Sequence, residues 1–241
     1  MRNTSTESVR EIVFDTETTG MTPGLGDEGD RLVEIGCVEL INLVPTGRTY
    51  HVYINPERDV PADAVAVHGL TTDMLKDKPL FGEVVADFID FIGNDSKLVA
   101  HNAEFDMKFI NFELKNAGFP TVDKRRVIDT LFIARQKFPG SPASLDALCR
   151  RFGIDNSNRT LHGALLDAEL LADVYLDLLG GRQHGFALAE ENESKSNAGD
   201  MVDLNSQKRD FREARSFPPS AEEIEAHKAL LDKIGDTIWA N

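Results

Sequence analysis

Residues 10–180 alternate between short apolar runs typical of β-strands and longer stretches in which apolar residues recur at helical spacing. The run EIVFDTET at 11–18 is apolar on both faces of its interior, which predicts a central strand covered on both sides. Further strands are expected at 32–41, 48–56, 97–102 and the start of 127–138, and helices at 83–93, 104–118, the rest of 127–138, 144–153 and 163–181. Three successive strands followed by alternating strands and helices predict an α/β fold, with a mixed sheet flanked by helices.

Glycine and proline mark the expected ends of several elements. The short connection at Pro45–Gly47 predicts that the second and third strands form an antiparallel hairpin. Gly118 and Pro120 are expected to end one helix, and Gly180 with Gly181 the last and strongest one.

The composition changes after residue 188. Residues 189–210 contain few bulky apolar side chains and show no periodicity, which predicts a disordered linker. Beyond Pro218 and Pro219, Ser220 and Glu223 match a helix capping box. Apolar residues then recur near helical spacing, at Ile224, Leu231, Ile234 and Ile238, with Trp239 beside them. We expect a short amphipathic helix that binds a partner, and the alternative is a helix that packs on its own domain.

Composition and charge exclude several classes of protein. The chain has 241 residues and a formal net charge of −15, which argues against a broad basic surface for nucleic acid. Two cysteines, Cys37 and Cys149, exclude a disulfide scaffold and a four-cysteine zinc site, and they fit a reducing cytosol. Because the N-terminus is polar and no apolar run reaches ~18 residues, we expect no signal peptide, no membrane span and a cytoplasmic location.

Two carboxylates occupy the predicted central strand. Side chains alternate along a strand, so Asp15 and Glu17 point to one face, and Phe14 and Thr16 point to the other. Two neighbouring carboxylates are costly to desolvate unless a cation lies between them. A solvated strand end is the alternative explanation for this pair.

Two more acids and one histidine stand in unusual places. Asp106 follows a strand and opens a helix, where it could serve as a cap unless Asn102 does so. Asp167 lies on the apolar stripe of the helix at 163–181, where a carboxylate is rarely buried without a partner. Within a helix His162 would lie ~140° away from Asp167, so His162 is expected on the preceding loop, from which it can reach that carboxylate.

These residues suggest a metal centre. Four carboxylates and one loop histidine without cysteine ligands favour Mg²⁺ or Mn²⁺ over Zn²⁺. Two such ions ~3.5–4 Å apart would offset the four negative charges and suit an in-line phosphoryl displacement. The metal ions, rather than the protein surface, would then supply positive charge for an anionic substrate.

Four motifs in this order and spacing resemble one enzyme family: FDTETTG at 14–20, VHGLT at 67–71, HNAEFD at 101–106 and HGALLDAE at 162–169. The chain resembles the DEDDh 3′–5′ exonucleases, which have a ribonuclease H-like fold, and among them the proofreading subunits of bacterial DNA polymerase III. The resemblance implies that two metal ions, Mg²⁺ or Mn²⁺, are held by Asp15, Glu17, Asp106 and Asp167. It implies that His162 is the general base and that Asp63 and His68 lie near the terminal nucleotide of the DNA. Asn102 and Phe105 are expected to line the pocket, although packing or capping would also explain them.

The resemblance also divides the chain and suggests partners. It implies an exonuclease domain at 1–182, a sliding-clamp-binding peptide at 183–188, a linker at 189–217 and a segment at 218–241 that binds the polymerase (alpha) subunit. In the proposed clamp peptide Gln183, Phe186 and Leu188 carry the pattern, and an ordinary linker is the alternative. The substrate would be a single-stranded or frayed 3′ end of DNA, and a small accessory (theta-type) subunit is a further candidate partner.

Two other functions compete with proofreading. An independent DEDDh ribonuclease would use the same acids and histidine, but it would have little use for a long tail that ends in an amphipathic helix. A catalytically inactive scaffold is disfavoured because every expected acid and the histidine are present.

Overall fold

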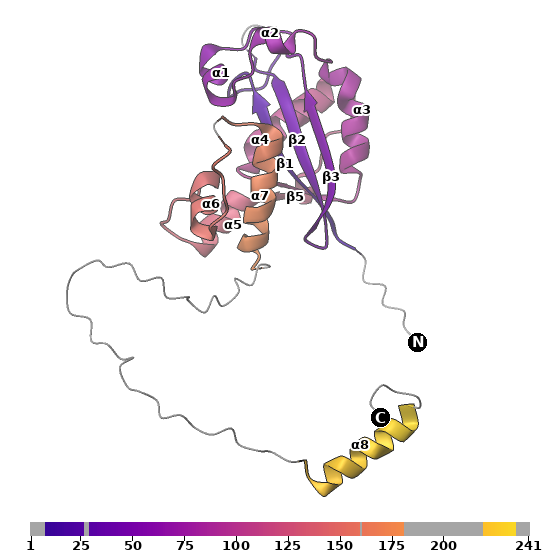
Figure 1. Ribbon diagram of the computed structural model, residues 1–241. Coiled ribbons are helices and arrows are strands. Elements are labelled where there is room, and N and C mark those ends of the chain that lie inside the picture. Colours follow the sequence, from indigo (N-terminus) through magenta and orange to yellow (C-terminus); the bar gives the residue numbers. More distant parts are fainter. Residues whose placement is uncertain (1–7, 27–28, 160, 181–218, 235–241) are drawn as a thin grey trace, which may run out of the picture. The chain divides into compact units, whose positions relative to one another are not determined.

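The computed structural model describes residues 8–26, 29–159, 161–180 and 219–234. A five-stranded sheet of order β3-β2-β1-β4-β5 forms its centre (Figure 1). The strands are β1 (Arg10–Thr18), β2 (Leu32–Ile41), β3 (Val44–Tyr53), β4 (Lys97–Ala100) and β5 (Val127–Asp129). β1 pairs antiparallel with β2 and parallel with β4, so the predicted mixed sheet is confirmed.

Helices cover both faces of the sheet. They are α1 (Ala62–His68), α2 (Thr72–Leu75), α3 (Phe81–Ile92), α4 (Ala103–Asn116), η1 (Lys124–Arg126), α5 (Thr130–Lys137), α6 (Leu145–Phe152), α7 (Ala164–Leu178) and α8 (Ala221–Ile234). Ile12 and Phe14 of β1 pack in one cluster with α3 and α4, whereas Val13 packs with α7 on the opposite face. The expected central strand, covered on both sides, is therefore confirmed.

The first hairpin differs from its prediction. Its turn is formed by Asn42 and Leu43, which both have positive φ (51° and 64°), and Pro45–Gly47 lies inside β3. A two-residue turn with positive φ at both positions matches the twist of the paired strands. Pro45 is tolerated in β3 because this strand is at the edge of the sheet. The prediction of a turn at Pro45–Gly47 is thus wrong.

Two short helices, α1 and α2, were not predicted. Each is at most seven residues long, which is too short for helical periodicity to stand out. α1 ends at Gly69, whose φ of 77° stops the helix.

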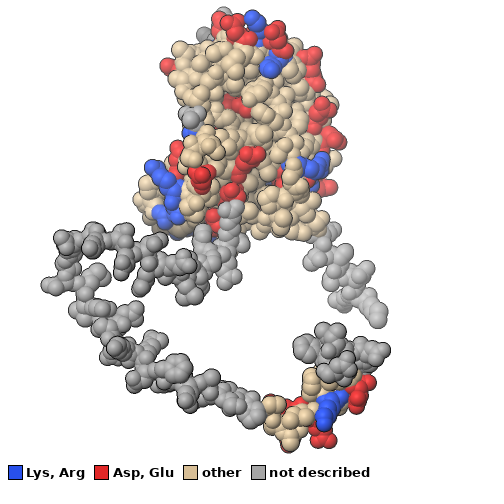
Figure 2. Space-filling view, in the orientation of Figure 1, with Lys and Arg blue, Asp and Glu red and all other residues tan. Residues whose placement is uncertain are grey.

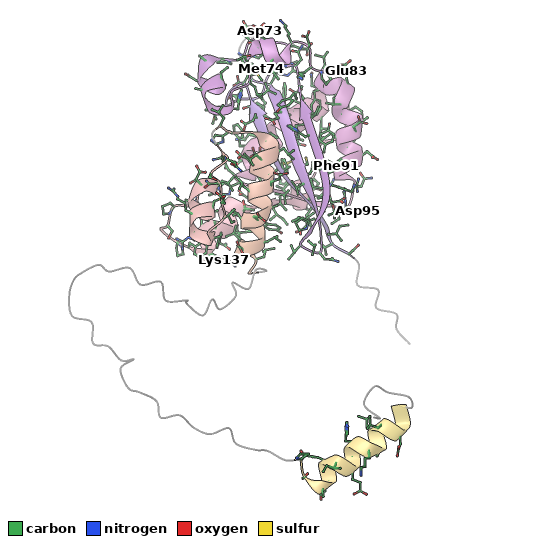
Figure 3. The ribbon with its side chains drawn as sticks, viewed as in Figure 1. Asp73, Met74, Glu83, Phe91, Asp95 and Lys137 are labelled. Atoms are coloured by element: carbon green, nitrogen blue, oxygen red, sulfur yellow. The ribbon has the colours of Figure 1, made fainter. Side chains whose placement is uncertain are left out.

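Arg10, at the start of β1, caps the C-terminal end of α3. Arg10 donates hydrogen bonds to the carbonyl oxygens of Phe91 and Ile92, the last residues of α3. Its guanidinium also lies 5.8 Å from the ring centre of Phe91, which is labelled in Figure 3. These contacts satisfy carbonyl groups that a helix end leaves free.

α8 belongs to a separate unit of the chain and is described by itself. The predicted capping box is confirmed, because the Glu223 amide donates to Ser220 Oγ and the Ser220 amide donates to Glu223 Oε2. Ile224 is exposed on this helix. The predictions for 183–188, 189–217, Ile238 and Trp239 lie outside the described residues. Within the described ranges, no helix combines the length and apolar character that crossing a membrane requires.

Candidate active site

A cleft of about 340 Å³ opens where β1 and β4 end, the edge at which ligands bind in open α/β sheets. Four segments line it: the end of β1, the start of α4, the start of α6, and the first turn of α7 with the loop before it. The lining residues are Asp15, Thr16, Glu17, His101, Asn102, Phe105, Asp106, Ser144, Leu145, Asp146, Arg159, His162 and Asp167. The structure therefore brings together the four predicted acids and the predicted histidine.

Asp15 and Glu17 reach the cleft from β1. Burial raises the pKa of Asp15 well above its usual value, and the nearby Asp106, Glu17 and Asp167 carboxylates raise it further. Burial also raises the pKa of Glu17 to about 8, with a further contribution from the charge of Glu34. Both carboxylates are crowded by negative charge, so the cleft favours a cation.

Asp106 is held by a neighbour on β1. It is buried in the first turn of α4 and accepts a hydrogen bond of 2.7 Å from Thr16 Oγ1. Burial raises the pKa of Asp106 to about 7, although the Thr16 hydrogen bond acts in the opposite direction. Thr16 was expected on the face away from the acids, and it serves the site by fixing Asp106.

Asp167 lies in the first turn of α7, and its side chain is only 3% exposed. Both of its oxygens accept hydrogen bonds from Arg159, from Nε at 2.5 Å and from Nη2 at 2.6 Å. This bidentate pair supplies the partner that a carboxylate on an apolar stripe requires. Sequence analysis did not identify Arg159, because a single arginine in a loop gives no sign of the acid that it will meet.

His162 precedes α7 on a loop and is half-exposed. Its Nδ1 lies 3.2 Å from Asp167 Oδ2 and 2.8 Å from Arg159 Nη2. The His162 amide donates to the carbonyl oxygen of Val67 in α1, which fixes the loop against that helix.

α1 carries the two other residues assigned to the nucleotide. His68 is buried in the last turn, where its Nδ1 accepts a hydrogen bond from the Leu70 amide, and burial lowers its pKa. A hydrogen bond with the Thr18 backbone raises that pKa, and the charge of His162 lowers it. Asp63 is exposed in the first turn of α1, and neither Asp63 nor His68 lines the cleft.

Asn102 and Phe105 both line the cleft. Asn102 is the N-cap residue of α4, but it has a left-handed backbone (φ 65°) and its side chain makes no capping hydrogen bond. Its backbone N–H donates to Asp129 Oδ1. Phe105 packs at 5.2 Å from the ring of Phe109 and presents an apolar surface at the cleft.

The residues of the cleft fit a divalent metal ion. Glu17, His162 and Asp167 can each offer a ligand atom, and these atoms all lie within 4.8 Å of one another. Carboxylate oxygens suit Mg²⁺ or Mn²⁺, and a bound cation would offset the negative charges that help to raise the pKa values of Asp15 and Glu17.

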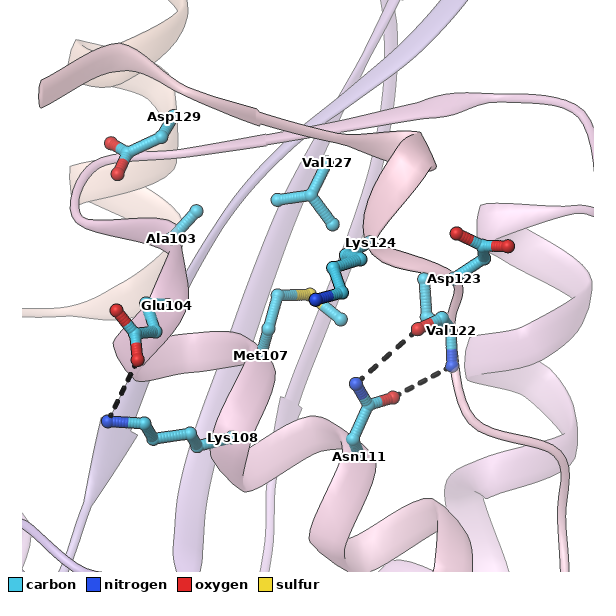
Figure 4. A pocket seen from close by; sticks show the side chains of 10 residues that line it. All are labelled: Ala103, Glu104, Met107, Lys108, Asn111, Val122, Asp123, Lys124, Val127 and Asp129. Atoms are coloured by element: carbon cyan, nitrogen blue, oxygen red, sulfur yellow. Dashed lines mark hydrogen bonds and ion pairs between the residues drawn. The ribbon is translucent and has the colours of Figure 1, made fainter. Parts of the chain in front are cut away.

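A larger cavity of about 870 Å³ lies beside the cleft, between α4 and the segment formed by η1 and β5 (Figure 4). Its charged side chains are partly paired with one another, as Glu104 and Lys108 show at 3.4 Å. It contains no acid of the cluster described above, so its size does not make it the centre of the chemistry.

Comparison with known proteins shows the family to which the chain belongs. The family described as exonuclease (RNase_T) matches residues 12–175. The nuclease domain of 3′hExo, a DEDDh family member bound to rAMP, has a TM-score of 0.59 at 19% identity, and the match covers 73% of this chain and 94% of that one. Exonuclease X in complex with 5′ overhanging duplex DNA has a TM-score of 0.53 at 28% identity, covering 71% of this chain and 91% of that one. The protein is thus an enzyme of the 3′–5′ exonuclease class with a ribonuclease H-like fold.

One group of known proteins is similar to this chain in sequence over nearly its whole length. The DNA polymerase III subunit epsilon of Rickettsia felis is 48% identical over 231 residues, which cover 94% of this chain and 97% of that protein. The chain therefore belongs to the exonuclease family and, within it, to the DNA polymerase III epsilon subunits.

Proposed function

We propose that the protein removes mispaired nucleotides from the 3′ end of newly made DNA, as the epsilon subunit of the DNA polymerase III core. One observation carries this proposal: a single cleft gathers Asp15, Glu17, Asp106, Asp167 and His162 in a chain of this family. The cytoplasmic location expected from the sequence belongs to the same proposal.

The chemistry follows from the donor set. Two divalent ions, Mg²⁺ or Mn²⁺, held by the four carboxylates would activate a water molecule and stabilise the leaving 3′ oxygen. His162 accepts the proton of the attacking water, because its half-exposed imidazole stands beside Asp167. Attack on the last phosphodiester releases a nucleoside 5′-monophosphate and shortens the strand by one nucleotide.

The terminal nucleotide is held by residues around the cleft. Phe105 offers a ring against which a base can pack, and Asn102 offers polar atoms beside it. His68 and Asp63 on α1 are proposed to contact the same nucleotide, because α1 is bonded to the His162 loop. Since a paired terminus must fray before it enters the cleft, single-stranded and mispaired ends are the preferred substrates.

The surface charge supports the proposal of a protein partner. Acidic side chains are spread over the face shown in Figure 2, and basic side chains form only small groups there. Such a surface attracts DNA weakly, whereas a tethered subunit receives DNA at high effective concentration. We assign this tethering to residues 218–241, which would bind the polymerase (alpha) subunit. The proposal also includes an exonuclease domain at 1–182, a clamp-binding peptide at 183–188 and a linker at 189–217. A theta-type subunit is proposed as a further partner.

The test compares full-length wild type with Asp15→Asn, His162→Ala and the surface control Asp73→Asn, whose side chain is 90% exposed. Primers labelled at the 5′ end carry a matched or a mispaired 3′ terminus, and cleavage is followed in Mg²⁺. We expect faster cleavage of the mispaired primer by wild type and Asp73→Asn, and loss of cleavage in the other two variants. Full activity of Asp15→Asn would contradict the metal mechanism, and preference for RNA would favour an independent ribonuclease.

A further inference from the structure

Arg159 occupies a singular position in the cleft. Its side chain is only 8% exposed, and it is the one lysine or arginine among the described residues that line the cleft. Its guanidinium contacts three segments: Asp167 on α7, Asp146 on α6 at 2.8 Å, and the loop residue His162. In a protein of net charge −15, a buried cation at this point requires an explanation.

The contacts of Arg159 coincide with those that a metal ion requires. Of the three residues whose ligand atoms lie within 4.8 Å of one another, Asp167 and His162 both contact the guanidinium. Arg159 engages both oxygens of Asp167, so a metal ion that binds this carboxylate competes with the guanidinium for the same charge. A guanidinium and a divalent ion bound to the same carboxylate would also repel each other.

Asp146 gives Arg159 a second anchor outside the metal cluster. Its side chain is 49% exposed, and it accepts a hydrogen bond from Arg159 Nη1, which is not one of the atoms bonded to Asp167. The guanidinium can therefore leave Asp167 and stay bonded at the edge of the cleft.

We propose that Arg159 is an internal counter-ion of the active site. Its guanidinium neutralises Asp167 in the metal-free enzyme, and it leaves Asp167 and stays bonded to Asp146 when a divalent ion binds Asp167. Arg159 thus sets the metal affinity, since each binding event must displace it. This inference rests on the metal site of the proposed function and adds a residue that lowers metal affinity while protecting the metal-free fold.

The test measures binding of MnCl₂ to the full-length protein by titration calorimetry, together with the melting temperature in EDTA and in Mn²⁺. Arg159→Gln should bind Mn²⁺ about tenfold more tightly than wild type. In wild type the metal ion must break the hydrogen bonds from the Arg159 guanidinium to Asp167, and the variant lacks these bonds. The same variant should melt at a lower temperature in EDTA and show a larger gain on addition of Mn²⁺. Arg31→Gln is the matched control, since Arg31 makes a bidentate pair with Glu113 that lies outside the lining of the cleft.

A second variant keeps the proposal testable if Arg159→Gln fails to fold. Asp146→Asn keeps the guanidinium but weakens its outer anchor, so it should bind Mn²⁺ more weakly than wild type. The proposal is overturned if wild type binds Mn²⁺ and Arg159→Gln binds it equally or less tightly, or if Asp146→Asn leaves the affinity unchanged. If wild type binds no Mn²⁺ at all, the metal mechanism itself fails, which is a different result.

Discussion

Asp15 on β1 lies directly opposite Gly36 on β2, and the missing side chain of Gly36 makes room for the first turn of α7. A Cβ atom on Gly36 would lie 2.2 Å from the backbone nitrogen of Leu165. This close approach lets α7 carry Asp167 to the acids of β1.

Gly36→Ala should therefore reduce both stability and activity. The new methyl group meets backbone rather than a flexible side chain, so α7 must move away, at a cost of about 1–3 kcal/mol in free energy of unfolding. Urea denaturation and the exonuclease rate in Mg²⁺ measure the two effects. Gly82→Ala in α3 is the control, because its Cβ meets nothing within 4 Å and alanine favours a helix. A Gly36→Ala enzyme of normal stability and rate would show that α7 does not need this approach.

Asp15→Asn and Asp167→Asn should abolish exonuclease activity while shifting metal-free stability in opposite directions. Removing the Asp15 charge relieves burial and repulsion, so the variant should gain about 1–2 kcal/mol in EDTA. Removing the Asp167 charge leaves the buried Arg159 guanidinium without its bidentate partner, so this variant should lose about 1–3 kcal/mol. Chemical denaturation in EDTA gives both values, and a gain in Asp167→Asn would contradict the assigned ion pair.

The metal-free protein should become less stable as the pH rises from 6.5 to 8.5. Glu17 has a pKa of about 8 and Asp106 of about 7 when folded, against ordinary values of 4.5 and 3.8. In this range the folded protein holds protons that the unfolded chain has released. As long as the pH is below the folded pKa, each rise of one pH unit therefore lowers the unfolding free energy by about 1 kcal/mol per proton. Burial lowers the pKa values of His68 and of the partly buried His101, and these two groups oppose this trend only below their ordinary value of 6.5.

Thermal melts in EDTA across this range measure the effect. Glu17→Gln should flatten the slope, and excess Mg²⁺ should do the same in wild type, because bound metal replaces the protons. A slope that Glu17→Gln does not change would mean that other groups carry it.

The apolar face of α8 should be required for binding the polymerase subunit but not for catalysis. Ile224 and Leu231 are seven residues apart and share one face of this helix. Replacing both with Asp in the full-length protein should abolish co-purification with the polymerase subunit and leave cleavage of single-stranded DNA within about twofold of wild type. Glu222→Gln with Glu225→Gln is the control for a general effect of surface changes. Retained binding by the double Asp variant would place the contact elsewhere.

The sequence predicted those site residues whose positions follow the periodicity of a single strand or helix. Strand alternation placed Asp15 and Glu17 on one side of β1, and helical spacing placed Asp167 on the stripe of α7. Both rules act within one element. The contact of Arg159 with Asp146 and Asp167 joins a loop to two helices, and no local pattern records such a contact.

The hairpin shows a similar limit. The turn at Asn42 and Leu43 depends on positive φ at both positions, which Asn adopts readily and Leu rarely does. Leu43 packs against the core cluster that contains α7, so tertiary contact compensates for an unfavourable backbone. Sequence alone favoured the neighbouring Pro45 and Gly47, which are the commoner turn residues.

The hydrogen bond from the His162 amide to the Val67 carbonyl oxygen makes one backbone proton a reporter of the contact between the histidine loop and α1. This amide can exchange with deuterium only when the histidine loop separates from α1. Its exchange rate therefore measures how often the histidine loop and α1 part from each other. A nucleoside monophosphate that contacts both the histidine loop and α1 should slow this exchange, whereas one that contacts only one of them should leave it unchanged.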